Sequence, residues 1–191
     1  MKLLVLDKDG TLTRTKSGHT FVQHPEDQVL IDGVAEAIAA YAADGWTMAI
    51  ASNQGGVAAG FKSLDDAIAE MEYAMKLIYP FLKYPQTLYF RGLLCPDDGA
   101  TAWCVSAFGA QGDWKHYEVT EPLTTREPLK PVNFRKPSIG MLLEAEEYLR
   151  FSDIDATKRL MIGDRDEDRG AAVNAGFEFM HVSDWLEPFI K

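Results

Sequence analysis

Two carboxylates lie two residues apart near the start of the chain, directly after a short apolar run. The run Leu3-Leu4-Val5-Leu6 is too short for a helix and is followed by a glycine-containing turn, so it predicts a buried strand. Asp7 and Asp9 then fall at the carboxyl end of this strand, which is where open α/β sheets bind their ligands. Neighbouring carboxylates repel each other unless a cation neutralises them. The pair therefore indicates a cation-assisted site, with an acidic turn after an edge strand as the plain alternative.

Three later segments place more polar residues beside predicted elements. The apolar run Thr47-Met48-Ala49-Ile50-Ala51 predicts a second strand, and Ser52-Asn53-Gln54-Gly55-Gly56 follows it. Arg135-Lys136-Pro137 stands at the start of a segment with helical periodicity. A third apolar run, Leu160-Met161-Ile162, leads into Gly163-Asp164-Arg165-Asp166-Glu167-Asp168. All of these polar groups fall at strand ends or helix starts, where ligand sites of α/β proteins are built.

Taken in chain order, these segments resemble the four motifs of the haloacid dehalogenase (HAD) superfamily of phosphatases. The resemblance extends from Lys2 to about Val182. Hydrolysis of a phosphate monoester is very slow without a catalyst, so such an enzyme must neutralise charge, align a nucleophile and protonate the leaving oxygen. The resemblance implies that Asp7 is the nucleophile, forming an aspartyl-phosphate, and that Asp9 is the general acid and base.

The resemblance also implies how the phosphoryl group is held. Ser52 is expected to bind it through its hydroxyl, and Lys136 to be the fixed cation on the phosphoryl oxygens and the nucleophile. Gly10, Asn53 and Arg135 are the implied substrate-binding positions. An ordinary turn between strand and helix is the alternative for Ser52 and Asn53.

The implied cofactor is Mg²⁺, which prefers oxygen ligands and is usually held by one or two carboxylates, water and substrate phosphate. In the superfamily the corresponding ligands are the carboxylate of Asp7, the backbone carbonyl of Asp9 and the carboxylate of Asp164. Asp168 lies one helical turn beyond Asp164 and is expected to orient the ligands rather than bind the metal.

A second, structural metal is not expected. Some relatives in this subgroup hold zinc on a Cys-x-His and Cys-x-Cys loop, but Cys95-Pro96-Asp97 lacks the histidine and Phe134 precedes Arg135 without a cysteine pair. Structural zinc needs four nitrogen or sulfur ligands, and Cys104 and His116 do not complete such a set.

The alternation of predicted strands and helices indicates a parallel sheet covered on both faces. We expect an α/β, three-layer Rossmann-like sheet of about five strands in a single domain over residues 1–191, without a large cap domain. The expected strands are 3–6, 46–51, 87–90, 160–162 and 177–182. The expected helices are 33–44, 64–78 with Ser63 as N-cap, 138–150 and 167–175.

Two intervals are the places where a cap could be inserted. The interval 11–32 holds only about twenty residues, enough for a short flap, and 92–133 holds about forty without clear periodicity. The second interval therefore predicts a long loop or a small insertion, with Arg126 and Lys130 as solvated charges. Both predictions imply an open site.

Composition places the chain among soluble globular proteins of ordinary size. It has 191 residues, of which 47% are hydrophobic and 25% charged, and no apolar stretch is long enough for a membrane span. No signal peptide is expected before the first strand, so a cytoplasmic location is the default. The net charge of −10 argues against a general nucleic-acid scaffold but permits a local basic patch. Monomer and homodimer both remain open.

The resemblance leaves three substrate classes within one subgroup: histidinol phosphate, heptose bisphosphate and polynucleotide 3′-phosphate ends. The segment Ser17-Gly18-His19-Thr20-Phe21 is similar to the polynucleotide type, whereas Ile162-Gly163-Asp164-Arg165 is similar to the histidinol-phosphate type. An open site also admits a chain end, so we favour a nucleic-acid 3′ end. The basic contacts would come from Arg14, Lys16 and His19, with Arg135. A small-molecule phosphatase is the alternative, and a phosphotransferase or an inactive binding module comes after it.

Overall fold

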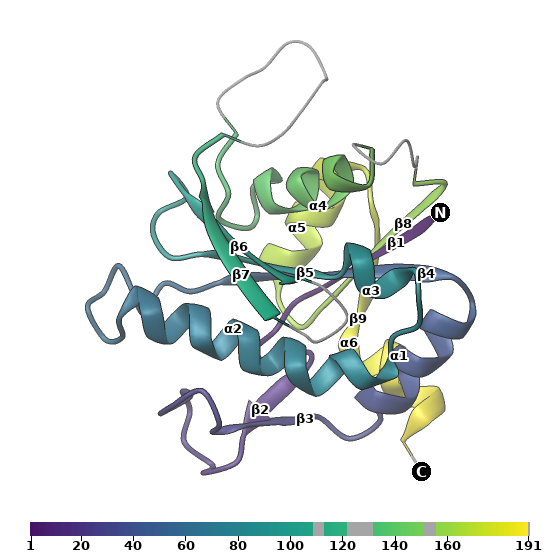
Figure 1. The fold of residues 1–191 in the computed structure, drawn as a ribbon, viewed down its shortest axis with the longest axis horizontal. Helices are drawn as coiled ribbons and strands as arrows, with labels where there is room; N and C mark the ends of the chain where they lie inside the picture. Colours follow the sequence, from purple (N-terminus) through teal and green to yellow (C-terminus); the bar gives the residue numbers. More distant parts are fainter. Residues whose placement is uncertain (109–112, 122–131, 151–155, 191) are drawn as a thin grey trace.

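A seven-stranded sheet forms the centre of the molecule, in a computed structural model that describes residues 1–108, 113–121, 132–150 and 156–190. The order across the sheet is β7-β6-β5-β4-β1-β8-β9. The strands span Lys2–Leu6 (β1), Trp46–Asn53 (β4), Arg91–Cys95 (β5), Ala102–Phe108 (β6), Asp113–Val119 (β7), Lys158–Gly163 (β8) and Glu178–His181 (β9). The pairs β5–β4, β4–β1, β1–β8 and β8–β9 are parallel, while β5–β6 and β6–β7 are antiparallel. The predicted α/β fold is thus confirmed, with an antiparallel extension at one edge (Figure 1).

Helices cover both faces of the sheet, because alternate residues of each buried strand point to opposite sides. Leu4 and Leu6 face the layer formed by α1, α2 and α6, whereas Leu3 and Val5 face α4 and α5. Figure 1 shows these two layers on opposite sides of the sheet. The helices span Val34–Ala43 (α1), Leu64–Ile78 (α2), Gln86–Tyr89 (α3), Gly140–Arg150 (α4), Asp166–Ala175 (α5) and Val182–Leu186 (α6), with single 3₁₀ turns at Tyr79–Phe81 and Glu187–Phe189.

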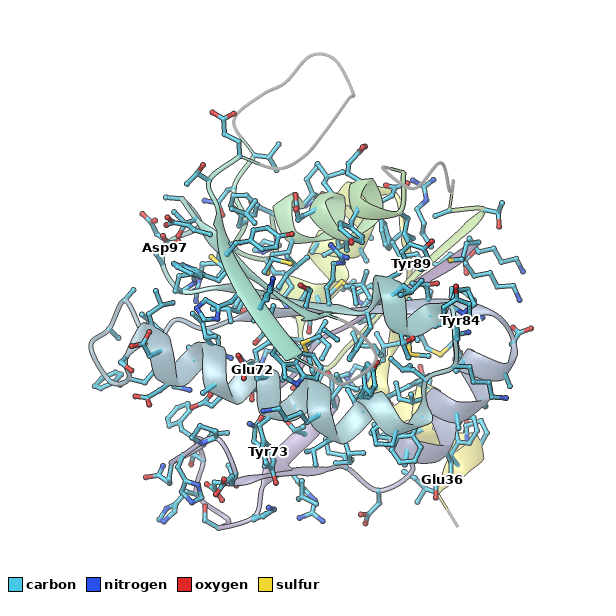
Figure 2. The ribbon with its side chains drawn as sticks, viewed as in Figure 1. Glu36, Glu72, Tyr73, Tyr84, Tyr89 and Asp97 are labelled. Atoms are coloured by element: carbon cyan, nitrogen blue, oxygen red, sulfur yellow. The ribbon has the colours of Figure 1, made fainter. Side chains whose placement is uncertain are left out.

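A small hairpin outside the main sheet covers part of α2. Its strands, Thr13–Thr15 (β2) and Gln28–Leu30 (β3), are antiparallel and correspond to the expected flap between residues 11 and 32. The Lys16 ammonium lies 3.3 Å from the Tyr73 hydroxyl on α2 and also donates to the Glu26 carbonyl. Figure 2 shows Tyr73 on the side of α2 that faces this hairpin.

The sheet has seven strands rather than about five, and two predictions at its edge were wrong. The third strand is Arg91–Cys95, and the predicted segment 87–90 lies mostly in the short helix α3. All five residues of β5 are buried. Burial in the sheet therefore decides which segment forms the strand, despite the high β propensity of the preceding residues. Residues 102–108 and 113–119 form strands β6 and β7, within the interval 92–133 where a long loop or a small insertion was expected. Arg126 and Lys130 lie outside the described residues.

The helix predicted over residues 64–78 is observed at those bounds. Ser63 caps it, its hydroxyl accepting a hydrogen bond of 3.0 Å from the Asp66 backbone N–H, as predicted. Among the described residues, no helix combines the length and the apolarity needed to cross a bilayer.

Candidate active site

The predicted site residues meet at the carboxyl ends of three neighbouring strands. Asp7 follows β1, Ser52 lies near the end of β4, and Asp164 follows β8. The Asp7 backbone N–H donates to the Ile162 carbonyl at 2.9 Å, which extends the pairing of β1 with β8 up to the site. These three side chains therefore converge because their strands are adjacent and parallel.

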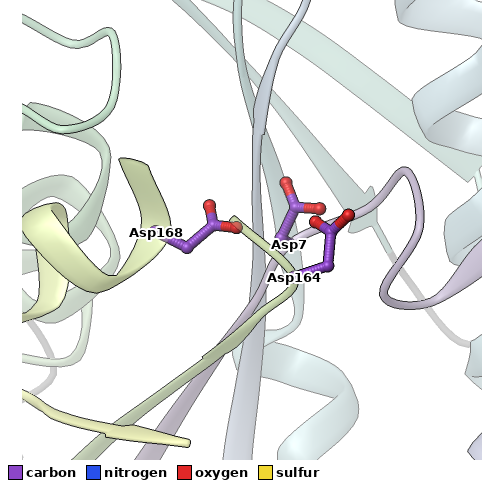
Figure 3. A group of neighbouring side chains, drawn as sticks. All are labelled: Asp7, Asp164 and Asp168. Atoms are coloured by element: carbon purple, nitrogen blue, oxygen red, sulfur yellow. The ribbon is translucent and has the colours of Figure 1, made fainter. Parts of the chain in front are cut away.

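Lys136 joins the first and last motifs through a buried ion-pair cluster. Its ammonium lies 2.6 Å from an Asp7 oxygen, 2.6 Å from an Asp168 oxygen and 2.6 Å from the Ala51 carbonyl. An ammonium has three donors, and these three acceptors use all of them. Figure 3 shows Asp7, Asp164 and Asp168 gathered around one point. In this structure Lys136 pairs with two buried carboxylates and offsets part of their negative charge.

The side chain of Asn53 holds the backbone of Lys136 in place. Its amide donates to the Lys136 carbonyl at 3.0 Å, and its oxygen accepts from the Lys136 N–H at 2.9 Å. This two-point contact uses the polar atoms that a substrate-binding role would need. The structure thus places Asn53 in contact with the loop that carries Lys136, and the predicted contact with substrate stays a prediction.

The electrostatics of the cluster keep Asp7 partly protonated near neutral pH when no metal is bound. Burial raises the pKa of Asp7 to about 6, although Lys136 acts in the opposite direction. Burial also raises the pKa of Asp164, against the influence of Arg165. For Lys136, burial lowers the pKa, but Asp7 and Asp168 outweigh it and raise the pKa above its ordinary value. Excess negative charge at this point favours a bound cation.

The described residues fit a divalent metal ion at this cluster. Carboxylate oxygens of Asp7, Asp164 and Asp168 lie within 4.8 Å of one another. Asp164 Oδ1 is buried and has no hydrogen-bond partner among the described residues, so a ligand is needed to satisfy it. Gly10 leaves the space beside this carboxylate, since a Cβ at Gly10 would lie 2.6 Å from Asp164 Oδ2. An all-oxygen set of this kind suits Mg²⁺.

Asp9 stands apart from this cluster and is held by two donors. One carboxylate oxygen accepts from the Lys8 ammonium at 2.5 Å, and the other accepts from the Gln54 amide at 2.8 Å. Burial would raise the pKa of Asp9, but Lys8, Gln54 and Lys62 together lower it below its ordinary value. Asp9 is therefore a carboxylate at neutral pH, in the form that can accept a proton from water.

The Ser52 hydroxyl connects the Asp9 side of the site to β4. It is buried and accepts a hydrogen bond of 2.8 Å from the same Gln54 amide that contacts Asp9. A hydroxyl that accepts in this way retains its own proton for donation, as a phosphoryl contact requires. The Ser52 hydroxyl is thus free to donate a hydrogen bond, and its binding of a phosphoryl group stays a prediction.

Arg135 reaches over the glycine turn that follows β4. Its guanidinium lies 3.0 Å from the position that a Cβ on Gly55 would occupy, and it donates to the Asp97 carbonyl at 3.2 Å. Its backbone N–H donates to the Asn133 side chain at 2.8 Å. Figure 2 labels Asp97, which lies in the loop after β5. Arg135 is thus anchored beside the turn that contains Gly55, and its contact with substrate stays a prediction.

The cysteines and His116 take positions in the edge of the sheet. Cys95 ends β5, Cys104 lies in the middle of β6, and His116 lies on β7 opposite Val105. Burial raises the pKa of Cys95 to about 12 and raises that of Cys104, so both thiols stay protonated.

Two of the basic side chains proposed for nucleic-acid contact, Arg14 and Lys16, contact other groups of the chain. Arg14 lies 3.7 Å from Asp32, and Lys16 donates to the Glu26 carbonyl at 2.7 Å. His19 is exposed on the hairpin loop, with its backbone carbonyl accepting from Thr15. The Lys16 contact links the two ends of the hairpin, whereas the Arg14–Asp32 pair is exposed and weak.

Sequence reasoning gave no role to Gln54, Lys8, Lys62 or Glu70, which surround Asp9. A signal was present for Glu70, because this acidic residue occupies the apolar face of α2. A charged residue on such a face needs a buried partner. The partners come from distant parts of the chain, so sequence spacing alone does not identify them.

Comparison with known proteins identifies a matching family and similar relatives. The family model described as "Polynucleotide kinase 3 phosphatase" matches residues 2–182. A D-glycero-beta-D-manno-heptose-1,7-bisphosphate 7-phosphatase of Photorhabdus laumondii is 29% identical over 171 residues, covering 89% of this chain and 73% of the relative. The corresponding enzyme of Haemophilus influenzae is 26% identical over 174 residues, covering 91% and 77%.

Among solved structures, the chain resembles the D,D-heptose 1,7-bisphosphate phosphatase of B. bronchiseptica, complexed with magnesium and phosphate. The TM-score is 0.58 at 22% sequence identity, and the match covers 94% of this chain and 79% of that protein. At this identity the likeness shows a common fold.

Proposed function

Since the chain belongs to the polynucleotide kinase 3 phosphatase family of HAD-superfamily phosphatases, we propose that it hydrolyses a small phosphorylated molecule with Mg²⁺ as cofactor. The observation that carries the proposal is the pairing of Lys136 with both Asp7 and Asp168, beside an Asp164 oxygen that has no hydrogen-bond partner within the described part of the chain. This arrangement provides a nucleophile, a fixed cation and a position for a metal.

The first step transfers the phosphoryl group to Asp7. An Asp7 carboxylate oxygen attacks phosphorus, and the bond from phosphorus to the ester oxygen breaks. Asp9 rests as a carboxylate, and the negative charge of a bound phosphate ester favours its taking up a proton. It gives this proton to the leaving alkoxide, so the alcohol departs neutral and Asp9 becomes a carboxylate again. Lys136 orients the Asp7 carboxylate, and Ser52 donates to a phosphoryl oxygen.

The second step returns Asp7 to its starting state. The Asp9 carboxylate takes a proton from water, and the hydroxide formed attacks phosphorus while the bond to the Asp7 oxygen breaks. Inorganic phosphate leaves, and Asp9 releases the proton to solvent and returns to its resting carboxylate form. The resting contacts of Asp9 with Lys8 and Gln54 favour the carboxylate that this step requires.

Magnesium is the metal that we propose for the acidic cluster. When bound, Mg²⁺ neutralises charge on the transferring phosphoryl group and on Asp7. Asp7 and Asp164 would hold it with the Asp9 carbonyl, while Asp168 remains paired with Lys136. The magnesium and phosphate in the B. bronchiseptica structure support this choice.

A sugar phosphate is the substrate class that we propose, in place of the nucleic-acid 3′ end favoured from sequence. Relatives that cover about nine-tenths of this chain are heptose bisphosphate phosphatases by name. The internal contacts of Arg14 and Lys16 also weaken the argument for a nucleic-acid contact. The argument from a forty-residue open loop loses force as well, because strands β6 and β7 occupy much of it.

Phosphate release from a matched panel tests the proposal. Heptose bisphosphate, histidinol phosphate, simple sugar phosphates and a 3′-phosphorylated oligonucleotide are compared with Mg²⁺ and with chelator. We expect the highest kcat/KM on a sugar phosphate and no turnover after chelation. A higher kcat/KM on the oligonucleotide would overturn the substrate class, and full activity with chelator would overturn the cofactor.

A further inference from the structure

A second cluster of buried charges lies behind Asp9, separate from the cluster around Lys136. Lys8 and Glu70 expose 1% and 3% of their side chains, and Lys62 exposes 20%. Burying three charged groups is unfavourable unless they are paired. The steps described above give Glu70 and Lys62 no part, and they involve Lys8 only through its contact with Asp9.

The contacts form a closed ring that begins and ends at Asp9. Lys8 donates to one Asp9 oxygen and lies 4.0 Å from Glu70. Glu70 pairs with Lys62 at 2.5 Å, and Lys62 donates to the Gln54 oxygen at 3.3 Å. The Gln54 amide then donates to the second Asp9 oxygen. Two lysines and two carboxylates balance the charge within this ring.

The orientation of Gln54 depends on Lys62. Its amide nitrogen contacts both Asp9 and Ser52 at 2.8 Å, while its oxygen faces the Lys62 ammonium. Without a cation at the oxygen, the amide can turn and present its acceptor to the Asp9 carboxylate, which would repel it. Lys62 lies in the loop before α2, and its pairing with Glu70 keeps it near Gln54.

Glu70 is also connected to the β2–β3 hairpin. Its backbone carbonyl accepts from the Gln28 amide at 3.0 Å, and the Gln28 oxygen accepts from Lys8 at 3.2 Å. Glu70, on α2, therefore contacts the hairpin through its backbone carbonyl and both lysines of the ring through its carboxylate.

We propose that Glu70 is a positioning residue for the acid–base step, holding Lys62 and Lys8 so that the Asp9 carboxyl points at the leaving oxygen and at the attacking water. The inference rests on the proposed function, because it assigns Asp9 to that step. Glu70 touches neither substrate nor metal in this account, and it acts through Lys62, Gln54 and Lys8.

Two esters with different leaving groups distinguish positioning from general damage. An alkyl phosphate needs a proton on its leaving oxygen, whereas p-nitrophenyl phosphate releases a stable phenolate without one. Glu70→Gln should therefore form the aspartyl-phosphate at the wild-type rate from p-nitrophenyl phosphate, but hydrolyse it slowly. We expect a burst of nitrophenol, accumulated phosphoenzyme, and at least about a tenfold fall in kcat on the alkyl ester.

Glu72→Gln is the matched control on the same helix. Glu72 pairs with Lys76 at 3.7 Å along α2 and has no place in the ring. Figure 2 labels Glu72 on α2. This variant should keep wild-type kinetics on both esters.

Lys62→Met is the second variant, and it decides the matter if Glu70→Gln does not fold. It should show the same burst and accumulation, and the double variant should be no slower than the slower single variant. Wild-type kinetics in a folded Glu70→Gln or Lys62→Met protein would overturn the inference. So would equal losses of the burst rate and of steady-state turnover. A wild-type protein that hydrolyses neither ester would instead refute the proposed function itself.

Discussion

Replacing Lys136 by methionine should destabilise the metal-free protein in a pH-dependent manner. The variant keeps a long side chain but removes the cation that lies 2.6 Å from both Asp7 and Asp168. Burial raises the pKa of Asp7 from 3.8 to about 6 in the folded protein, with Lys136 opposing the rise. A carboxyl whose pKa rises on folding costs stability; the cost is absent below the unfolded pKa and complete above the folded pKa.

The size of the effect follows from this pKa. Without Lys136 the folded pKa of Asp7 rises further, so the variant loses about 1.4 kcal/mol for each pH unit above about 6. At about pH 7.5 the ionisation of Asp7 alone then lowers the free energy of unfolding of the variant by about 2 kcal/mol. The lost pairing with Asp168 adds to this loss, and the sum approaches the roughly 3–5 kcal/mol typical of a broken buried ion pair. At about pH 6 Asp7 is about half protonated in the wild-type protein and almost fully protonated in the variant, so the difference should shrink by about 2 kcal/mol.

Chemical denaturation with chelator at the two pH values measures this difference. Lys158→Met is the control, because Lys158 is exposed and lies outside the site. It should change the free energy of unfolding by less than about 0.5 kcal/mol at either pH. A Lys136→Met penalty below about 1 kcal/mol at the higher pH, or one that is equal at both, would refute the reasoning.

Two other predictions concern the metal. Gly10→Ala should weaken Mg²⁺ binding at least about tenfold, because residue 10 has a φ of +90° and a Cβ there would lie 2.6 Å from Asp164 Oδ2. Calorimetry measures the affinity for Mg²⁺, and an unchanged affinity would exclude close packing of Gly10 against Asp164. Mg²⁺ binding should also weaken about tenfold from pH 7 to pH 5, since a proton on Asp7, with its pKa of about 6, competes with the metal. Proton release measured in two buffers checks this sign, and tighter binding at the lower pH would contradict it.

The strands that deliver the site could be predicted from sequence, because each is a buried apolar run followed directly by polar residues. The strand expected over 46–51 is observed as Trp46–Asn53, and that expected over 160–162 as Lys158–Gly163. The long helix α2 was predicted at its observed bounds, because its apolar periodicity and its Ser63 cap agree.

The edge of the sheet could not be predicted in the same way. Strands β6 and β7 depend on pairing with β5, and a segment rich in turn residues gives little local evidence of that pairing. The shift of the third strand to Arg91–Cys95 has a similar cause, since burial in the sheet decided between two neighbouring candidates.

The candidate site divides between motif residues and long-range partners. The resemblance to known phosphatases located Asp7, Ser52, Lys136 and Asp164, and the fold brings them together at neighbouring strand ends. The use of the Asn53 side chain to hold Lys136 depends on three-dimensional contact and was not foreseen. The ring that includes Glu70 has the same character, because its members are joined only by folding.

Covalent trapping of the phosphoryl group tests the central claim most directly. Asp9→Asn slows hydrolysis of the intermediate, so this variant is mixed with p-nitrophenyl phosphate and Mg²⁺, quenched in acid and digested for mass spectrometry. The account predicts that the peptide containing Asp7 carries one phosphoryl group on Asp7, and that Asp7→Asn carries none and releases no phosphate. A phosphoryl group on another residue, or turnover by Asp7→Asn without deamidation, would contradict it.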